Sequence, residues 1–247
     1  MQPVDAALDV ALIVMKNGGS TDMADRTFKN ILKGYGQKGV SASWRLDFVA
    51  AHGGAEGQSS TVMKPVGSIG VNLVRASEAV VLGERVAKGE VDVAVLPSEI
   101  KRVNTLAPHF NRWMIVAAAA CAAAGFSQIT GGDWGALGIT FVAAGIGQFV
   151  RSLLQAMKLA VAPVTLTCGI LSACIAGIGL RLGWSQTAPA VAIASVIYMV
   201  PGLPLINGFV DMVRHKYLLV GLERIANAAF LFLVLAIAIA FACVVVM

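Results

Sequence analysis

From residue 113 onward the chain consists of long uncharged runs separated by single charges or short charged groups. The runs cover residues 113–132, 134–150, 159–180, 182–210 and 225–247. A bilayer core of about 30 Å requires about 20 apolar residues in a helix, so the first, third and fifth runs each predict one transmembrane span. The second run is short and contains Gln148, and we expect it to pack against other helices rather than against lipid.

The fourth run is too long for one straight span. Residues 182–210 would extend over roughly 43 Å as a single helix. Pro201 and Pro204 lack N–H donors and flank the flexible Gly202, so they predict a break. Unpaired backbone groups cost several kcal/mol in hydrocarbon, so such a break is stable only where it is buried in protein or lines a wet cavity. We therefore predict spans at residues 113–130, 134–150, 159–180, 188–206 and 225–247, with a candidate binding site at the break.

The first 111 residues show short amphipathic segments instead. Apolar residues at helical spacing predict helices over residues 4–17, 21–33 and 72–88, with Ser20 or Thr21 capping the second. Alternation predicts a strand over residues 40–49, which a strand over residues 61–66 could pair through a glycine-rich hairpin loop at residues 52–60. Residues 91–112 predict a further helix that Pro97 and Pro108 open or kink. This pattern is typical of a small α+β domain.

Composition supports a membrane protein with two unlike parts. The chain is 57% hydrophobic and 13% charged, with a mean hydropathy of +0.76, which excludes an ordinary soluble globular protein. Residues 1–111 carry 12 basic and 11 acidic residues, against seven and three in the remainder. The excess of positive charge lies beside apolar spans, which argues against a nucleic-acid partner. We therefore predict a cytoplasmic α+β domain over residues 1–111 and an all-α domain of five transmembrane helices over residues 112–247.

The positions of basic residues predict the orientation. Only Arg181 lies on one side of the predicted spans, and the other eight residues near span ends lie on the opposite side, which is then cytoplasmic. They are Lys101, Arg102, Arg112, Arg151, Lys158, Arg214, Lys216 and Arg224. The N-terminus is expected inside, and residues 131–133 and the C-terminus outside. No signal-peptide pattern opens the chain, so the first targeting signal is the span after residue 112.

A membrane-anchored hydrolase is one alternative. The candidate catalytic residues for such a site in the N-terminal domain are His52, Ser20, Asp22, Asp25 and Arg26. Helix capping and the helix dipole already explain the serine and the first aspartate, and the histidine has no partner at ligand spacing. The four cysteines lie in predicted spans without Cys-x-x-Cys spacing. We therefore expect no enzyme activity, no metal and no cofactor.

Polar residues within predicted spans are costly and mark functional candidates. Asn207 and Asp211 share a helix face after the break, and Asp211 could meet Arg224 near the cytoplasmic end, as a ligand contact or as a structural ion pair. A helix that restarts at Pro204 would offer free N–H groups to a carboxylate. The predicted substrate-binding residues are Pro201, Gly202, Pro204, Asn207, Asp211, Arg224, Asn227, Thr165, Thr167 and Gln148.

These motifs together resemble the threonine/serine exporter family (ThrE) over essentially the whole chain. The most specific element is Pro201-Gly202, Pro204, Asn207-Gly208 and Asp211, continued by Gly221 and Arg224. In the N-terminal part, Asn17-Gly18-Gly19-Ser20, Gly67-Ser68 and Asn72-Leu73 are also similar. One departure is the turn Arg214-His215-Lys216, where the family pattern favours a small residue.

The resemblance implies export across a bacterial inner membrane, driven by the proton gradient. The implied substrates are threonine and serine, or small dicarboxylates such as succinate in members that consist of two proteins, so the ligand is small and anionic or zwitterionic. Single-chain members carry about twice as many spans, and this chain therefore resembles the larger subunit of the split pairs. A smaller membrane subunit or a second copy would complete the transporter. A scaffold subunit that never touches substrate is the second alternative.

Overall fold

The computed structural model describes residues 2–53, 60–107 and 110–246. The chain divides into two compact units, and neither is continuous in sequence. Unit 1 combines residues 1–109 with residues 202–226, and unit 2 combines residues 110–201 with residues 227–247. The predicted boundary at residues 111–112 concerns which part lies outside the membrane, and it stays a prediction.

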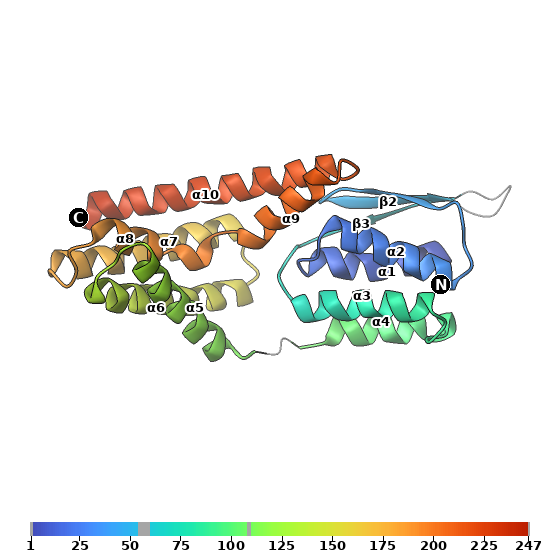
Figure 1. Cartoon of the computed structure of the whole chain (residues 1–247), viewed down its shortest axis with the longest axis horizontal. Coiled ribbons are helices and arrows are strands. Elements are labelled where there is room, and N and C mark those ends of the chain that lie inside the picture. The colour runs from blue at the N-terminus through green and yellow to red at the C-terminus, as the bar shows by residue number, and fades with distance from the viewer. Residues whose placement is uncertain (1, 54–59, 108–109, 247) are drawn as a thin grey trace. The chain divides into compact units, whose positions relative to one another are not determined.

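Unit 1 is built around α1 (Pro3–Lys16), which α2 (Thr21–Gly34), α3 (Leu73–Ala87), α4 (Leu96–Thr105) and a small sheet contact (Figure 1). Ten of the 14 residues of α1 are buried. Apolar side chains on every face of a helix favour a central position, because each face then removes apolar surface from water. The α1 helix is therefore the core onto which the rest of unit 1 packs.

The sheet is antiparallel in the order β1-β2-β3, with β1 at Ser41–Trp44, β2 at Phe48–Gly53 and β3 at Ser60–Pro65. The predicted single strand over residues 40–49 is wrong, because the chain turns after Trp44. The N–H of Arg45 donates to the carbonyl of Phe48 at 3.1 Å, and Asp47 accepts from the N–H of Phe48. Aspartate favours such turns, and the alternation of side chains continues across this one.

The second hairpin pairs β2 with β3, as predicted for residues 61–66, although its first strand is β2 alone. His52 lies within β2, opposite Thr61, rather than in a loop. Residues 54–59 of the predicted loop lie outside the described residues. The last predicted helix of this half also differs: a short 3-10 turn, η1 (Val93–Val95), precedes α4, which Pro97 opens and which ends at Thr105. Pro108 lies outside the described residues.

The C-terminal part of unit 1 consists of α9 (Gly202–Val213) and the beginning of α10 (Leu218–Val246). Tyr217 and Val220 belong to the same hydrophobic cluster as α1. The α10 helix begins about two turns before residue 225, where the last span is predicted to start. Where the span itself begins stays a prediction. Glu223 and Arg224 do not end the helix, because their charges are paired with partners in unit 1.

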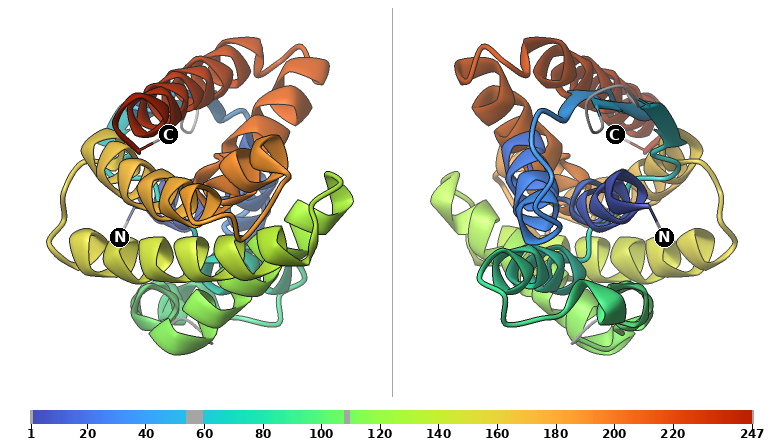
Figure 2. Two further views of the ribbon diagram at one scale, coloured as in Figure 1. Left: turned by 90° about the vertical axis from the view of Figure 1, so that its left-hand side faces the viewer. Right: turned by 90° about the vertical axis from the view of Figure 1, so that its right-hand side faces the viewer.

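Unit 2 contains α5 (Arg112–Ile129), α6 (Trp134–Ala156), α7 (Val161–Arg181), α8 (Ala188–Ala194), the 3-10 turn η2 (Ile197–Met199) and the remainder of α10 (Figure 2). The α6 helix contacts α5, α7 and α8. Buried alanine and glycine residues line these contacts and let the helices approach closely. The α6 helix runs past Arg151 to Ala156, whereas the second span is predicted to end at residue 150, and that span boundary stays a prediction.

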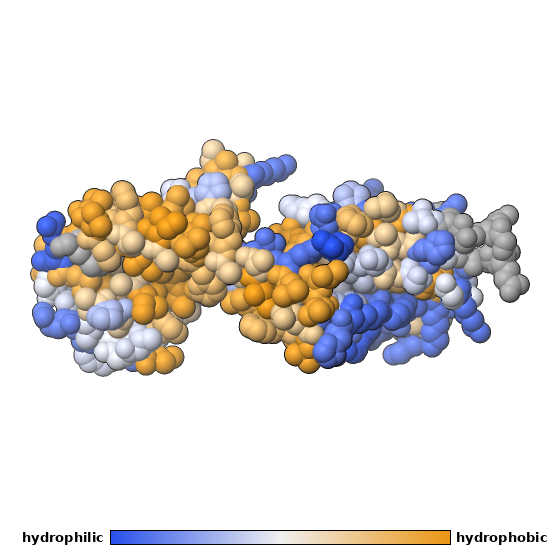
Figure 3. Space-filling view, turned by 90° about the horizontal axis from the view of Figure 1, so that it is seen from above, coloured by the Kyte–Doolittle hydropathy of each residue, from blue (hydrophilic) through white to orange (hydrophobic). Residues whose placement is uncertain are grey.

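The break in the fourth apolar run is confirmed. Helical structure stops at Met199 and resumes at Gly202, two residues before the predicted restart at Pro204. Across the described residues, four helices are long and apolar enough to cross a membrane, or five if α8–η2 and α9 are counted as one bent span. Hydrophobic residues dominate the visible surface of unit 2, whereas the most hydrophilic residues gather mainly on unit 1 (Figure 3).

Candidate functional site

The loop between α1 and α2 brings a helix N-terminus and two glycine carbonyls to one point of unit 1. Gly18 has φ +96°, a conformation that favours glycine, and a Cβ there would lie 2.7 Å from the side chain of Leu203 in α9. Ser20 caps α2, as predicted, and its Oγ accepts from the N–H of Met23 at 3.3 Å. The first N–H groups of α2 therefore face α9.

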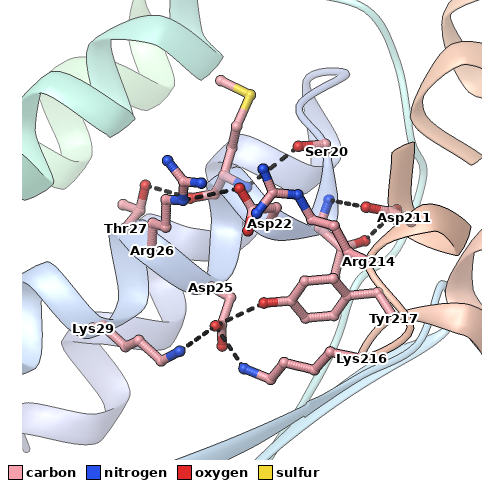
Figure 4. A network of polar contacts seen from close by, with 12 residues as sticks. Ser20, Asp22, Asp25, Arg26, Thr27, Lys29, Asp211, Arg214, Lys216 and Tyr217 are labelled. Carbon is pink, nitrogen blue, oxygen red and sulfur yellow. Dashed lines mark hydrogen bonds and ion pairs between the residues drawn. The ribbon is translucent and has the colours of Figure 1, made fainter. Parts of the chain in front are cut away.

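Asp211 of α9 accepts from this helix N-terminus and is fully buried (Figure 4). Its Oδ1 accepts from the backbone N–H of Thr21 at 3.1 Å, and its Oδ2 accepts from the Thr21 hydroxyl at 2.7 Å. One turn earlier in α9, the amide of Asn207 donates to the carbonyl of Gly18 at 2.9 Å. A carboxylate is stabilised at this position by the free N–H groups and by the positive end of the α2 dipole.

Arg224 of α10 completes the cluster. Its Nε lies 3.1 Å from Oδ2 of Asp211, and its Nη2 donates to the carbonyl of Gly19 at 3.4 Å. Arg224 is 4% exposed and Asp211 is 0% exposed. The predicted meeting of these two residues is therefore confirmed, and it is a buried ion pair that also reaches the α1–α2 loop.

Two glycines let α9 and α10 approach closely enough for this pair. A Cβ on Gly221 would lie 2.7 Å from the carbonyl oxygen of Gly208, and a Cβ on Gly208 would lie 3.1 Å from that of Gly221. Real Cβ atoms rarely come so near to backbone. Gly208 and Gly221 therefore allow the backbones of the two helices to be in direct contact.

A second polar group lies one turn further along α2. The carboxylate of Asp25, 2% exposed, accepts from Lys29 at 2.6 Å, Lys216 at 2.9 Å, Tyr217 at 2.8 Å and the indole of Trp44 at 3.0 Å. Burial alone would raise the pKa of this carboxyl, but the hydrogen bonds, above all that from Lys216, lower it to about 2. Burial and the nearby carboxylate raise the pKa of Tyr217, so its hydroxyl stays a donor.

The basic turn after α9 also contacts α2. Arg214 donates to Asp22 at 2.9 Å, and Arg26 forms a second ion pair with the same carboxylate at 2.9 Å. With Lys216 on Asp25, two of the three residues in the turn that departs from the family pattern are paired with acids of α2. The basic residues of this turn therefore have acidic partners on α2.

Chemically, this cluster holds helices together. Each oxygen of Asp211 already accepts a hydrogen bond from Thr21, and Arg224 and Asn207 are directed at protein groups. The arrangement fixes α9 and the start of α10 against the N-terminus of α2. The predicted role of these three residues in substrate binding stays a prediction.

The other predicted site residues have unlike surroundings. In unit 2, Gln148 and Thr165 are buried, whereas Thr167 and Asn227 are exposed. Pro201 is buried, and Gly202 and Pro204 at the start of α9 are partly exposed. Gln148 lines an open pocket in unit 2 together with Arg151 and Tyr198.

The residues considered for a hydrolase take part in structural contacts. Ser20 caps α2, Asp22 pairs with Arg26 and Arg214, and His52 is exposed on β2 with its Nδ1 2.9 Å from the hydroxyl of Thr61. Within the part of the chain that the structure describes, no group of three or more His, Cys, Asp or Glu side chains could hold a metal ion.

Sequence reasoning missed Thr21 and Tyr217 as members of the site and considered Asp25 only as hydrolase material. A buried aspartate beside the apolar residues of α2 was a detectable signal, because isolated carboxylates are rarely buried without partners. Thr21 contacts Asp211, and Tyr217 contacts Asp25, across about 190 positions of sequence, and no local pattern identifies these two pairs.

Comparison with known proteins connects this arrangement with a family. The family model described as "Putative threonine/serine exporter" (ThrE) matches residues 5–246. The "Probable succinate transporter subunit YjjP" of Klebsiella aerogenes is 24% identical over 239 residues, which are 95% of this chain and 90% of that protein. The protein of the same name from Escherichia coli K12 is 24% identical over 228 residues, or 91% and 87%.

No solved structure matches the chain. The family match extends from α1 to the last residue of α10, and so it includes both compact units and the cluster of Asp211 and Arg224. The resemblance noted in the sequence is thereby confirmed. The chain belongs to the threonine/serine exporter family, ThrE.

Proposed function

We propose that this chain is one subunit of an inner-membrane exporter of small carboxylates, and that it works with a second membrane subunit. The observation that carries the proposal is the match to an exporter family over residues 5–246, in a chain whose apolar helices number four or five. Two relatives that the chain covers almost entirely are named as succinate transporter subunits. A dicarboxylate such as succinate is therefore the first substrate to test, and threonine and serine are the next.

We further propose that unit 1 lies on the cytoplasmic side. Unit 1 contains most of the charged residues of the chain, and the positive-inside rule, applied to the basic residues near the apolar helices, favours this orientation. The ion pair between Asp211 and Arg224 then anchors the segment after the break to the cytoplasmic domain.

The break supplies the proposed path for the substrate. Gly202 begins α9, so the first N–H groups of that helix lack carbonyl partners within the helix, and the positive end of its dipole lies at the same place. Pro201 and Pro204 keep the chain from closing the gap with regular hydrogen bonds. Such a discontinuity is the usual place at which helical transporters hold an anionic group.

The test is export from cells that lack their own exporter of the substrate. Such cells would receive the gene for this chain, the gene for a candidate smaller membrane subunit, or both, and the external concentrations of succinate, threonine and serine would be followed with and without a protonophore. We expect export only with both genes and collapse of export when the proton gradient is dissipated. Export by this chain alone would contradict the two-subunit proposal, and no export from any combination would contradict the function.

A further inference from the structure

Unit 2 contains a pocket of about 460 Å³ at the beginning of α5. Met114 and Ile115 of α5 form part of its apolar wall, and Gln148, Arg151 and Tyr198 supply its polar groups. Pockets for small molecules commonly measure about 300–1,000 Å³ and combine apolar walls with a few converging polar groups. Both the size and the lining of this pocket therefore fit a small ligand.

Arg151 is the positive charge of the pocket, and unit 2 does not neutralise it. Its Nη1 donates to the backbone carbonyl of Tyr198 at 3.0 Å, which uses one of the five donors of a guanidinium. Asp133 is the one acidic residue in residues 110–201 and 227–247. It caps the opposite end of α6, where it accepts from the N–H groups of Ala136 and Gln186, about 27 Å from Arg151 along the helix.

Gln148 lies one turn before Arg151 and on the same face of α6. The residue is 7% exposed, and its side chain lines the pocket. The pocket therefore combines a cation that unit 2 does not neutralise with an amide one turn away, and both side chains can donate to a ligand that supplies oxygen atoms.

Tyr198 forms the side of the pocket that precedes the break. Its hydroxyl lies 2.9 Å from Oγ of Ser172, which is 3.0 Å from the carbonyl of Ala143. A Cβ on Gly147 would lie 2.0 Å from that hydroxyl, so this glycine is required for the tyrosine to reach its position. The position of η2, and hence of the carbonyl that Arg151 contacts, is fixed by these contacts.

We propose that this pocket binds a carboxylate group of the exported substrate, with Arg151 as a bidentate partner and Gln148 as a hydrogen-bonding partner. A planar guanidinium matches the two oxygens of a carboxylate, and an anion there would remove the cost of a single charge among apolar groups. This inference rests on the proposed function and locates its first binding step. By the orientation proposed above, the pocket lies at the cytoplasmic end of unit 2, where an exporter admits its substrate.

The experiment measures succinate binding to the purified complex of the chain with its partner subunit by isothermal titration calorimetry, and export in cells. Arg151→Gln removes the charge and two charge-assisted bonds, so we expect affinity to fall by about tenfold or more. Arg151→Lys keeps the charge but loses bidentate geometry, so we expect a smaller loss. Gln148→Leu should weaken binding by several-fold. Arg181→Gln, an exposed arginine at the end of α7, is the matched control and should bind as the wild type does.

Complex assembly and thermal stability of each variant separate loss of binding from loss of fold. Unchanged binding and unchanged export in Arg151→Gln would overturn the pocket assignment while leaving the exporter function intact. Arginine-dependent binding without export from cells would support the pocket and contradict the function. An effect of Arg151→Gln that appears only in bilayers of anionic lipid, with succinate binding unchanged in detergent, would identify a lipid phosphate as the occupant and overturn the proposal.

Discussion

Asp211 and Arg224 form an ion pair away from water, where desolvation of both charges costs as much as their attraction returns. The helix N-terminus changes this balance, because Thr21 adds two hydrogen bonds to the carboxylate and the α2 dipole adds a favourable potential. We infer that the pair mainly fixes how α9 and α10 meet α2, and that its loss would leave Arg224 buried without a counter-charge.

Asp211→Asn tests that inference. The amide cannot neutralise Arg224, so we expect unit 1 to lose about 3–5 kcal/mol of unfolding free energy. Pulse proteolysis of the purified protein in urea measures this loss. Asp22→Asn is the control, because Asp22 pairs with arginines that are 65% and 46% exposed, and such surface pairs contribute about 1 kcal/mol or less.

The double variant Asp211→Asn with Arg224→Met separates the ion pair from the remaining contacts. Removal of both charges should recover part of the stability lost in the single variant, since no buried charge is then left unpaired. Additive losses in the double variant would show that the two side chains are not energetically coupled. The export assay on the same variants distinguishes a scaffold role from a transport role. A transport role predicts reduced flux in a complex that still assembles, whereas a scaffold role predicts a less stable complex.

Asp25 predicts a pH dependence of stability. Its pKa in the folded protein is about 2, below the ordinary value of 3.8. The contribution of its charge is therefore complete above about pH 4 and is lost as the pH falls toward 2, with a size of about 2 kcal/mol at most. Hydrogen exchange of the α2 amides should accelerate across this range more in the wild type than in Asp25→Asn. Equal pH profiles for the two proteins would contradict the assignment.

The α9 helix has two unlike faces. Asn207, Gly208 and Asp211 are buried within unit 1, whereas Ile206, Phe209 and Val213 are 63%, 58% and 78% exposed. A helix that is anchored by polar groups on one face and exposes large apolar side chains on the other is suited to the membrane interface. Its contact with α10 depends on glycine, which gives a test at the level of helix packing.

Gly221→Ala should push α9 and α10 apart. The new Cβ would lie 2.7 Å from the carbonyl oxygen of Gly208, and backbone cannot yield as a flexible side chain does. We expect a loss of about 1–3 kcal/mol, the usual cost of overpacking, measured by the same proteolysis. Gly202→Ala is the matched control, because a Cβ there meets nothing within 4 Å. Equal stability of the two variants would refute close backbone contact as the reason for Gly221.

Local patterns in the sequence were sufficient for the first three helices of unit 1 and for the break, because helical spacing, proline positions and capping residues act within a few positions. These patterns were insufficient where the role of a residue depends on a partner that is distant in sequence. Arg224 was taken as the start of a span because a charge is costly in an apolar helix, yet Asp211 neutralises it. Arg151 was treated only as a marker of orientation, although α6 continues past it and it lines a pocket.

At the scale of the whole chain, the fact that unit 1 contains two separate segments of the sequence constrains the number of membrane crossings. Residues 202–226 belong to the same compact unit as the N-terminal domain. If that unit lies in the cytoplasm, the chain must return there after α7, although α8 and η2 together are shorter than a complete span. The chain would then cross five times, with the bent pair counted as one crossing, and α10 would end outside.

A reporter fused after α10 distinguishes five crossings from four. With five, alkaline phosphatase at this position is active and green fluorescent protein is dark; with four, in which the bent pair does not cross, the pattern is reversed. We expect the five-crossing result, because only with five crossings would Arg181 be the single basic residue near a span end that faces outside. A fusion in the loop between α5 and α6 is the control and should report outside in both cases. A cytoplasmic reporter after α10 would place the bent pair as a re-entrant segment and would remove the proposed path through the break.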